Sequence, residues 1–83
     1  MYTYISLLRG INVSGQKRVL MPELKAVYES LGFSLVTTYL QSGNVVFTCD
    51  NKDEAATSSK IEATIAWHFG FHVPVILGNR TDF

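Results

Sequence analysis

One stretch of the chain decides the fold: Thr38-Tyr39-Leu40-Gln41-Ser42-Gly43-Asn44-Val45-Val46-Phe47. β-Branched and aromatic residues at both of its ends favour strands. Gly43 lies between Ser42 and Asn44 and favours a tight turn, because glycine adopts positive φ without steric strain. The stretch is therefore predicted to be a β-hairpin, and the neighbouring elements can be predicted outward from it.

The segment before the hairpin has the pattern of a strand, a loop and a helix. Residues 2–8 are aromatic and aliphatic, which indicates a strand, whereas residues 9–18 carry the glycines and polar residues of a loop. Pro22 suits the first turn of a helix, and an apolar stripe follows at helical spacing. The stripe consists of Leu24, Val27, Tyr28 and Leu31. Gly32 is expected to end the helix, and residues 35–40 form the first strand of the hairpin.

The segment after the hairpin predicts one more helix and one more strand. Residues 45–49 complete the hairpin, and three polar residues then offer a helix N-cap: Asp50, Asn51 and Asp53. The helix is expected to reach about residue 69, because large apolar residues recur at a spacing of four. These positions are Ile61, Ile65 and Phe69. Gly70 should stop the helix. Residues 73–77 are predicted to be the last strand, in which Pro74 indicates a sheet edge or a bulge.

The predicted order β-α-β-β-α-β is the ferredoxin-like pattern. With right-handed crossovers it gives an α+β fold: a four-stranded antiparallel sheet in the order 4-1-3-2, with two helices on one face. Residues 1–83 are expected to form a single domain of this type. Residues 79–83 have the pattern of a strand exit followed by a helix cap, with no helix after it, so we expect a truncated chain; the alternative is a ragged natural terminus.

Alternation along the hairpin sorts its residues between the two faces of the sheet. The same residues share a face whether the turn centres on Ser42-Gly43 or on Gly43-Asn44, because both turn positions preserve parity. The more apolar set is expected beneath the helices: Val36, Thr38, Leu40, Val45, Phe47 and Cys49. The other set is expected on the open face: Thr37, Tyr39, Val46 and Thr48, with Gln41 and Asn44 at its end. We also expect Tyr4 and Ser6 on this face, which would be aromatic and nearly uncharged.

Composition excludes several classes of protein. Seven Lys+Arg balance seven Asp+Glu, so the chain lacks the basic excess of a general nucleic-acid or membrane-surface binder. A single cysteine excludes an internal disulfide and a cysteine-rich zinc site, and it is compatible with a reducing compartment. No signal-peptide pattern is visible, and no apolar run approaches the roughly 20 residues of a membrane span. We therefore expect a cytoplasmic protein.

The topology brings polar residues together at one end of the sheet. The first two strands end there, the third begins there, and the first helix starts there. Glycine-rich backbone, cationic side chains and a helix N-terminus converge, which predicts a site for a small anionic ligand. The candidate binding residues are Arg9, Gly10, Asn12, Lys17, Gln41, Ser42, Gly43 and Asn44. In the alternative, structural interpretation, these residues only tie the loop to the hairpin as turn formers and carbonyl partners.

No catalytic constellation is visible, and we do not expect an enzyme. Ser42 and His72 are predicted at the same end of the sheet but two strand spacings apart, about 9–10 Å, which is too far for a hydrogen bond. His68 and His72 have the spacing of a helical metal-binding pair, but Gly70 is expected to break the helix between them. Neither a metal site nor a cofactor is expected.

The open face bears on the class of partner. An RNA-recognition sheet of this topology carries a basic-Gly-aromatic motif on its third strand, whereas the open-face residues here are Val46 and Thr48. Nucleic acid is therefore not an expected partner, and neither is a membrane. An uncharged face more naturally packs against protein, as a homodimer or against a missing second domain.

Several segments together resemble the family known as domain of unknown function 1697. Its hallmark, Arg-Gly-Ile-Asn-Val with two small residues and a lysine, is matched by residues 9–17, and Met21 and Leu24 match a second motif. The strongest block, Thr-Tyr-x-Gln-Ser-Gly-Asn-Val-x-Phe, is matched by residues 38–47, and Phe-Gly-Phe-x-Val-Pro-Val is matched by residues 69–75. The resemblance implies a cytoplasmic, mostly bacterial protein with a ferredoxin-like fold and usually a second α+β half. On this resemblance, residues 1–83 are expected to be the N-terminal part of a longer two-domain protein. The resemblance implies no activity.

The functional expectation is a binding module for a small anionic ligand. Arg9 and Lys17 would supply charge, while Ser42 and Asn44 would orient the ligand by hydrogen bonds. The alternative is a protein–protein interaction or dimerisation module that uses the open sheet face. A third reading, half of an enzyme site completed by a second domain, has no general base in the sequence to support it.

Overall fold

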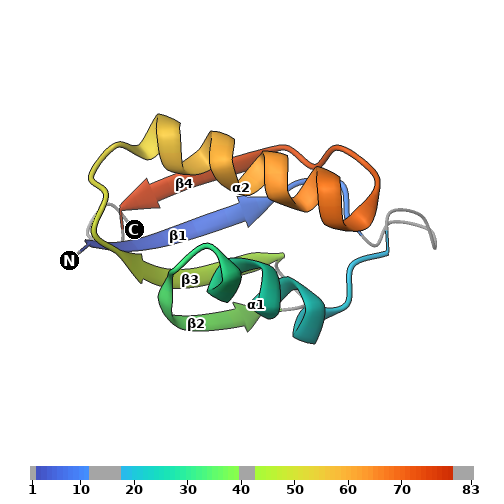
Figure 1. Cartoon of the computed structure of the whole chain (residues 1–83), viewed down its shortest axis with the longest axis horizontal. Helices are drawn as coiled ribbons and strands as arrows, with labels where there is room; N and C mark the ends of the chain where they lie inside the picture. Colours follow the sequence, from blue (N-terminus) through green and yellow to red (C-terminus); the bar gives the residue numbers. More distant parts are fainter. Residues whose placement is uncertain (1, 12–17, 40–42, 80–83) are drawn as a thin grey trace.

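A computed structural model describes residues 2–11, 18–39 and 43–79 of the chain. Its elements follow in the order β1 (Tyr2–Leu8), α1 (Met21–Ser30), β2 (Ser34–Tyr39), β3 (Asn44–Cys49), α2 (Glu54–Phe69) and β4 (Val75–Asn79). The strands form one four-stranded antiparallel sheet in the order β2-β3-β1-β4. Both helices lie on the same face of this sheet (Figure 1). The predicted ferredoxin-like fold is confirmed, including its strand order.

Helix α1 begins and ends as its sequence predicts. Pro22 lies in its first turn, where a missing N–H removes no helical hydrogen bond, and Glu23 lies near the positive end of the helix dipole. The side chains that face the sheet are almost fully buried: Leu24, Val27 and Tyr28. Gly32 follows the helix with φ +87°, a conformation that favours glycine.

Helix α2 is capped at both ends. The side chain of Asp53 accepts a hydrogen bond from the amide of Ala56 at 3.1 Å, which makes Asp53 the N-cap. Ile61 and Ile65 are fully buried between the helix and the sheet. Gly70 ends the helix with φ +83°, and its amide donates to a carbonyl in the last turn.

A cluster of aromatic rings fills the space between the helices and the sheet. The ring of Phe47 in β3 lies 4.4 Å from that of Phe33, 5.3 Å from that of Tyr28 and 5.8 Å from that of Tyr4, measured between centroids. These separations are typical of stabilising aromatic pairs. The cluster therefore joins β1, β3 and α1 into one core.

The same core contains two buried hydroxyl groups, those of Ser6 and Tyr28. The Oγ of Ser6 donates to the carbonyl oxygen of Val45 at 3.1 Å and lies 2.7 Å from the hydroxyl of Tyr28. Because serine has a single hydroxyl proton, Tyr28 is the donor to Ser6. Burial raises the pKa of Tyr28 above its ordinary value of 10.0, so this hydroxyl stays protonated. The pair connects α1 to β1 and leaves neither group unpaired.

The expectation that Tyr4 and Ser6 lie on the open face is wrong. In the register of β1 with β3, Tyr4 lies opposite Phe47 and Ser6 opposite Val45, and directly paired residues share a face. Tyr4 and Ser6 are 1% and 0% exposed beneath the helices. Ser6 accepts this burial because its hydroxyl is hydrogen-bonded. The alternate residues of β1 occupy the open face instead: Thr3, Ile5 and Leu7.

Strand β4 begins at Val75, whereas the sequence predicted a start at residue 73. Pro74 lacks an amide proton and donates nothing to the sheet, although its carbonyl accepts a hydrogen bond from the amide of Arg9 at 3.1 Å. Proline therefore precedes the strand and does not interrupt it. Val73 is still fully buried in the core. β4 pairs with β1 alone, which confirms the prediction of an edge strand.

Candidate functional site

The loop after β1 and the hairpin turn after β2 meet at one end of the sheet. The amide of Leu8 donates to the carbonyl of Gly43 at 3.0 Å. Gly43 has φ +66°, and a Cβ at this position would lie 3.1 Å from the backbone oxygen of Leu8 and 4.0 Å from Cδ1 of Ile11. Both the conformation and the close approach favour glycine here. The described ends of the two segments are therefore in contact.

The structure locates half of the predicted binding residues. Arg9 and Gly10 are exposed, Gly10 with φ +73°, and Gly43 and Asn44 are half-buried. The other four lie outside the described residues: Asn12, Lys17, Gln41 and Ser42. Within the described ranges, Arg9 is the cationic member of this rim, so the ligand site stays a prediction.

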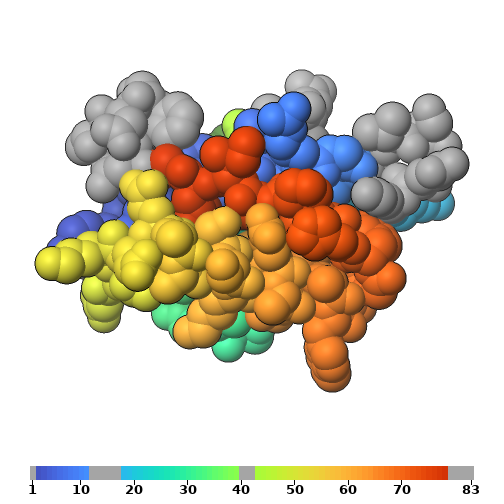
Figure 2. Space-filling model, turned by 90° about the horizontal axis from the view of Figure 1, so that it is seen from above, coloured from blue at the N-terminus to red at the C-terminus, as the bar shows by residue number. Residues whose placement is uncertain are grey.

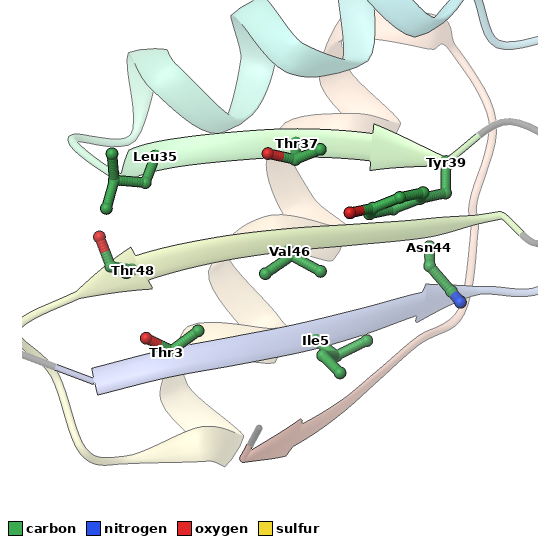
Figure 3. Close-up of a pocket in the computed structure, with 8 residues that line it drawn as sticks. All are labelled: Thr3, Ile5, Leu35, Thr37, Tyr39, Asn44, Val46 and Thr48. Atoms are coloured by element: carbon green, nitrogen blue, oxygen red, sulfur yellow. The ribbon is translucent and has the colours of Figure 1, made fainter. Parts of the chain in front are cut away.

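Asn44 belongs to a second feature, a hollow on the open face of the sheet. The hollow has a volume of about 500 Å³ and is lined by side chains from three strands. They are Thr3, Ile5, Leu35, Thr37, Tyr39, Asn44, Val46 and Thr48. Figure 3 shows these side chains on the face turned away from the helices. Leu35 and Tyr39 lie at the two ends of β2, Val46 lies on β3 and Ile5 lies on β1.

Strand register arranges the open face in rows that run across the sheet. One row crosses all four strands through Tyr39, Asn44, Leu7 and Ile76, and the next runs through Thr37, Val46, Ile5 and Gly78. Directly paired residues share a face, so each row is a continuous strip of surface. The first row is the more exposed and apolar: Tyr39 is 51%, Ile76 49% and Leu7 38% exposed.

No strand of this sheet contains a charged residue. The charged residues that the structure describes lie on the two helices and in the loops, such as Lys25 and Glu29 on α1 and Lys60 and Glu62 on α2. Edge strands usually carry charges that keep other chains away, and the edge strands β2 and β4 carry none. This open face has hydroxyl, amide and apolar groups only, which suits contact with another uncharged surface.

Leu35 is the most unusual residue of the open face. Its φ is +53°, a conformation that costs a non-glycine residue about 1–2 kcal/mol. It lies where the register of β2 and β3 shifts between Ser34 and Thr37, as in a β-bulge. Its side chain is 77% exposed. Backbone strain concentrates at functional positions, and here it accompanies an exposed apolar side chain.

Helix α2 protects the outer edge of β4. The carboxylate of Glu62 accepts a hydrogen bond from the amide of Val75 at 2.8 Å, and Oγ of Ser58 donates to the carbonyl of Val75 at 2.9 Å. Figure 2, which looks onto this edge, shows α2 (yellow to orange) alongside β4 (red). Both outward backbone groups of Val75 are thereby satisfied, which discourages strand addition at this point.

The sequence interpretation missed part of the open face. It placed Tyr39, Val46 and Asn44 there, but not Leu35 or Ile5. Leu35 was assigned to a strand without the bulge, and the faces of the first strand were exchanged. Thr3, Ile5 and Leu7 alternate with Tyr4 and Ser6 along the strand. The two sets differ too little in polarity for the sequence to assign them to faces.

The described residues hold no cluster of three or more metal-ligating His, Cys, Asp or Glu side chains. Neither helix of the described chain is long and apolar enough to cross a bilayer. The features that remain for function are the rim around Gly43 and the open face.

Comparison with known proteins places the fold in a family. The sequence matches the family described as "protein of unknown function (DUF1697)" over residues 1–83. The chain belongs to the DUF1697 family. The resemblance read from its motifs is thereby confirmed. No curated protein matches this DUF1697 chain.

A solved structure has the same fold as this DUF1697 chain. It is the conserved bacterial protein SP0830 from Streptococcus pneumoniae, 36% identical to it with a TM-score of 0.81. The similarity covers 98% of this chain and 44% of that chain, so the DUF1697 chain spans less than half of that relative.

Proposed function

We propose that this domain is a protein-interaction module that packs its open sheet face against another protein surface. The observation that carries the proposal is the hollowed open face itself, which contains no charge and leaves Leu35, Tyr39 and Ile76 largely exposed. Large exposed apolar side chains gathered on one face are typical of interaction sites. A cytoplasmic location belongs to the same proposal and is supported by the lone cysteine, which needs no partner.

The face can be tested with one variant at its centre and one control on the opposite side. Val46→Lys places a charge in the middle of the hollow, whereas Trp67→Ala removes an 86% exposed ring from α2. The affinity-tagged native chain should retain a partner protein, which can be an untagged copy of the same chain. The Trp67→Ala chain should retain the same partner equally well. Val46→Lys should lose it, because burying an unpaired ammonium group is strongly unfavourable.

The retained protein is then purified and its binding measured by calorimetry with the same three chains. The proposal is supported if the order of affinities repeats. It is contradicted if no protein shows this pattern, or if Trp67→Ala removes binding while Val46→Lys keeps it.

A second candidate function is the binding of a small anionic ligand at the rim. It is favoured by the contact of Leu8 with Gly43, which brings the exposed Arg9 and the positive-φ Gly10 to the hairpin turn. In this proposal Asn44 and the predicted residues Asn12, Lys17, Gln41 and Ser42 complete the site.

Calorimetric titration with inorganic phosphate and with a nucleoside triphosphate tests the second candidate. Arg9→Ala should weaken binding about tenfold without lowering the melting temperature, since its side chain is exposed. Arg18→Ala, at another exposed arginine, is the control and should bind normally. Equal loss in both variants would indicate only general charge attraction, and a loss of stability without loss of affinity would indicate a structural role for Arg9.

A further inference from the structure

The open face carries a protrusion and a depression side by side. Leu35 projects from the edge strand β2 and is 77% exposed. The hollow of about 500 Å³ lies beside it, and its floor contains the half-buried Ile5 and Val46. Figure 3 shows Leu35 at one end of the hollow. A surface with a knob and a hole on the same patch is complementary to itself.

The position of Leu35 is held by its neighbours. Its φ of +53° belongs to the bulge between Ser34 and Thr37. The hydroxyl of Thr48 donates to the carbonyl of Ser34 at 3.1 Å, directly before the strained residue. Strain and exposed apolar surface are both unfavourable for the isolated domain, so an arrangement that keeps both points to a contact made elsewhere.

We propose that a second copy of this chain covers the open face, with each Leu35 inserted into the hollow of the other copy about a two-fold axis. The proposal rests on the proposed interaction function and names its partner. In such an isologous contact Leu35 of one copy meets Ile5 and Val46 of the other, and the reverse contact follows from symmetry.

Charge favours a second copy over a charged partner. The strands contain no Asp, Glu, Lys, Arg or His side chain, so two copies meet without like-charge repulsion, and the face offers nothing to select a basic or acidic surface. The hydroxyl groups of Thr3 and Thr37 lie among the apolar residues and can exchange hydrogen bonds across the contact.

The size of the face sets the expected strength of the dimer. Four strands about 4.8 Å apart and about 20 Å long form a small sheet. Each copy contributes about 400 Å² of sheet face, so two stacked copies cover about 800 Å² in total, which is below the roughly 1,200 Å² of stable interfaces and in the range of weak, transient ones. A reversible dimer is expected, with a dissociation constant of the order of tens of micromolar.

Sedimentation velocity of the 83-residue chain, from about 1 to about 500 μM, measures this equilibrium. The chain should pass from monomer to dimer, and raising the salt concentration should not weaken the dimer, because no ion pair holds it. Leu35→Gly keeps the positive φ accessible and removes only the knob, so it should weaken association about tenfold or more while the domain stays folded by circular dichroism. Trp67→Ala is the matched control and should leave association unchanged.

A cross-link gives an independent readout. Chains carrying Leu35→Cys mixed with chains carrying Ile5→Cys should form a mixed disulfide under mild oxidation, because the two positions meet across the two-fold axis. Chains carrying Trp67→Cys should not cross-link with Ile5→Cys.

Three results would overturn the second copy as partner: a monomer at every concentration, a dimer that Leu35→Gly does not weaken, or a dimer lost in Trp67→Ala. If the chain is monomeric but retains a different protein in a manner sensitive to Val46→Lys, the interaction function stands and only self-association falls. If neither association is seen, both fall.

Discussion

The amide of Leu8 and the carbonyl oxygen of Gly43 form a 3.0 Å hydrogen bond that joins the end of β1 to the turn between β2 and β3. This bond extends the β1–β3 ladder by one residue beyond the pair of Leu7 with Asn44. Two segments far apart in the sequence therefore meet because of strand pairing, and their contact needs no ligand. The close approach also explains why glycine occupies position 43.

Gly43→Ala should destabilise the domain more than Gly32→Ala does. Both positive φ and the 3.1 Å approach to the Leu8 oxygen oppose a Cβ, so we expect a loss of about 2–3 kcal/mol in the free energy of unfolding. Gly32→Ala is the control, because Gly32 has φ +87° but no atom within 4 Å of the added Cβ, and it should lose about 1 kcal/mol. Urea unfolding measures both, and equal losses would show that the contact with Leu8 is unimportant.

Ser6→Ala should cost more stability than Tyr28→Phe. Removing the Ser6 hydroxyl leaves the buried Tyr28 hydroxyl without its acceptor, and the expected loss is about 2–3 kcal/mol. Tyr28→Phe removes the donor but leaves Ser6 bonded to Val45, so about 1 kcal/mol is expected. In the double variant the Tyr28 hydroxyl is no longer stranded, and the loss should be smaller than the sum of the two single losses. Additive losses would mean that the two hydroxyls act independently.

Stability should fall at alkaline pH because of Tyr28. Its pKa in the folded protein is raised by burial above the ordinary value of 10.0, so the unfolded chain releases this proton first as the pH rises. The contribution of Tyr28 is therefore fully present below about pH 10 and is lost progressively above it. Urea unfolding between about pH 8 and 11 should show this decline, and Tyr28→Phe should show a shallower one. An identical decline in the variant would assign the effect to other groups.

Glu62→Ala should open the edge of β4 near Val75. The variant leaves the Val75 amide without its 2.8 Å acceptor, so its hydrogen exchange should accelerate and about 1 kcal/mol of stability should be lost. Glu62→Gln keeps an acceptor oxygen and should protect the amide nearly as well as the native residue. Exchange measured by NMR distinguishes the two variants. If the Val75 amide exchanges equally fast in both variants, the carboxylate charge, and not the hydrogen bond, protects the edge.

The faces of β2 and β3 could be predicted from the sequence even though the predicted register of the hairpin was wrong. The observed pairing of Tyr39 with Asn44 differs from both turn positions considered in the sequence by an even shift in register. Parity survives such a shift, so the faces assigned to β2 and β3 are correct although the pairing register is not. The caps of the helices were also readable, since Asp53, Gly32 and Gly70 each have a local mechanism.

The first strand shows where local pattern is insufficient. Tyr4 and Ser6 carry hydroxyl groups and look suited to an open face, whereas Ile5 and Leu7 look suited to a core. Tertiary partners reverse this order, because Tyr28 and the Val45 carbonyl satisfy Ser6, and the Asn51 carbonyl accepts from the Tyr4 hydroxyl at 2.8 Å. Such partners are distant in sequence and invisible to periodicity.

The bulge at Leu35 was equally beyond the sequence. Leucine gives no local signal for positive φ, and the bulge follows from how β2 and β3 align. The hollow beside it therefore emerges only in three dimensions. For the rim, the meeting of Leu8 and Gly43 agrees with the predicted topology, while the ligand remains a prediction.

The position of β1 in the sheet has a consequence for how the chain is made. This strand leaves the ribosome before the other strands of the sheet, yet it lies between β3 and β4, and β4 emerges after both of the others. One side of β1 therefore stays unpaired until β4 has emerged. It is a row of free amides and carbonyls, and the strand has no charged side chain to repel a neighbouring nascent chain. The pairing of β4 therefore completes the sheet and shields β1 from pairing with another chain.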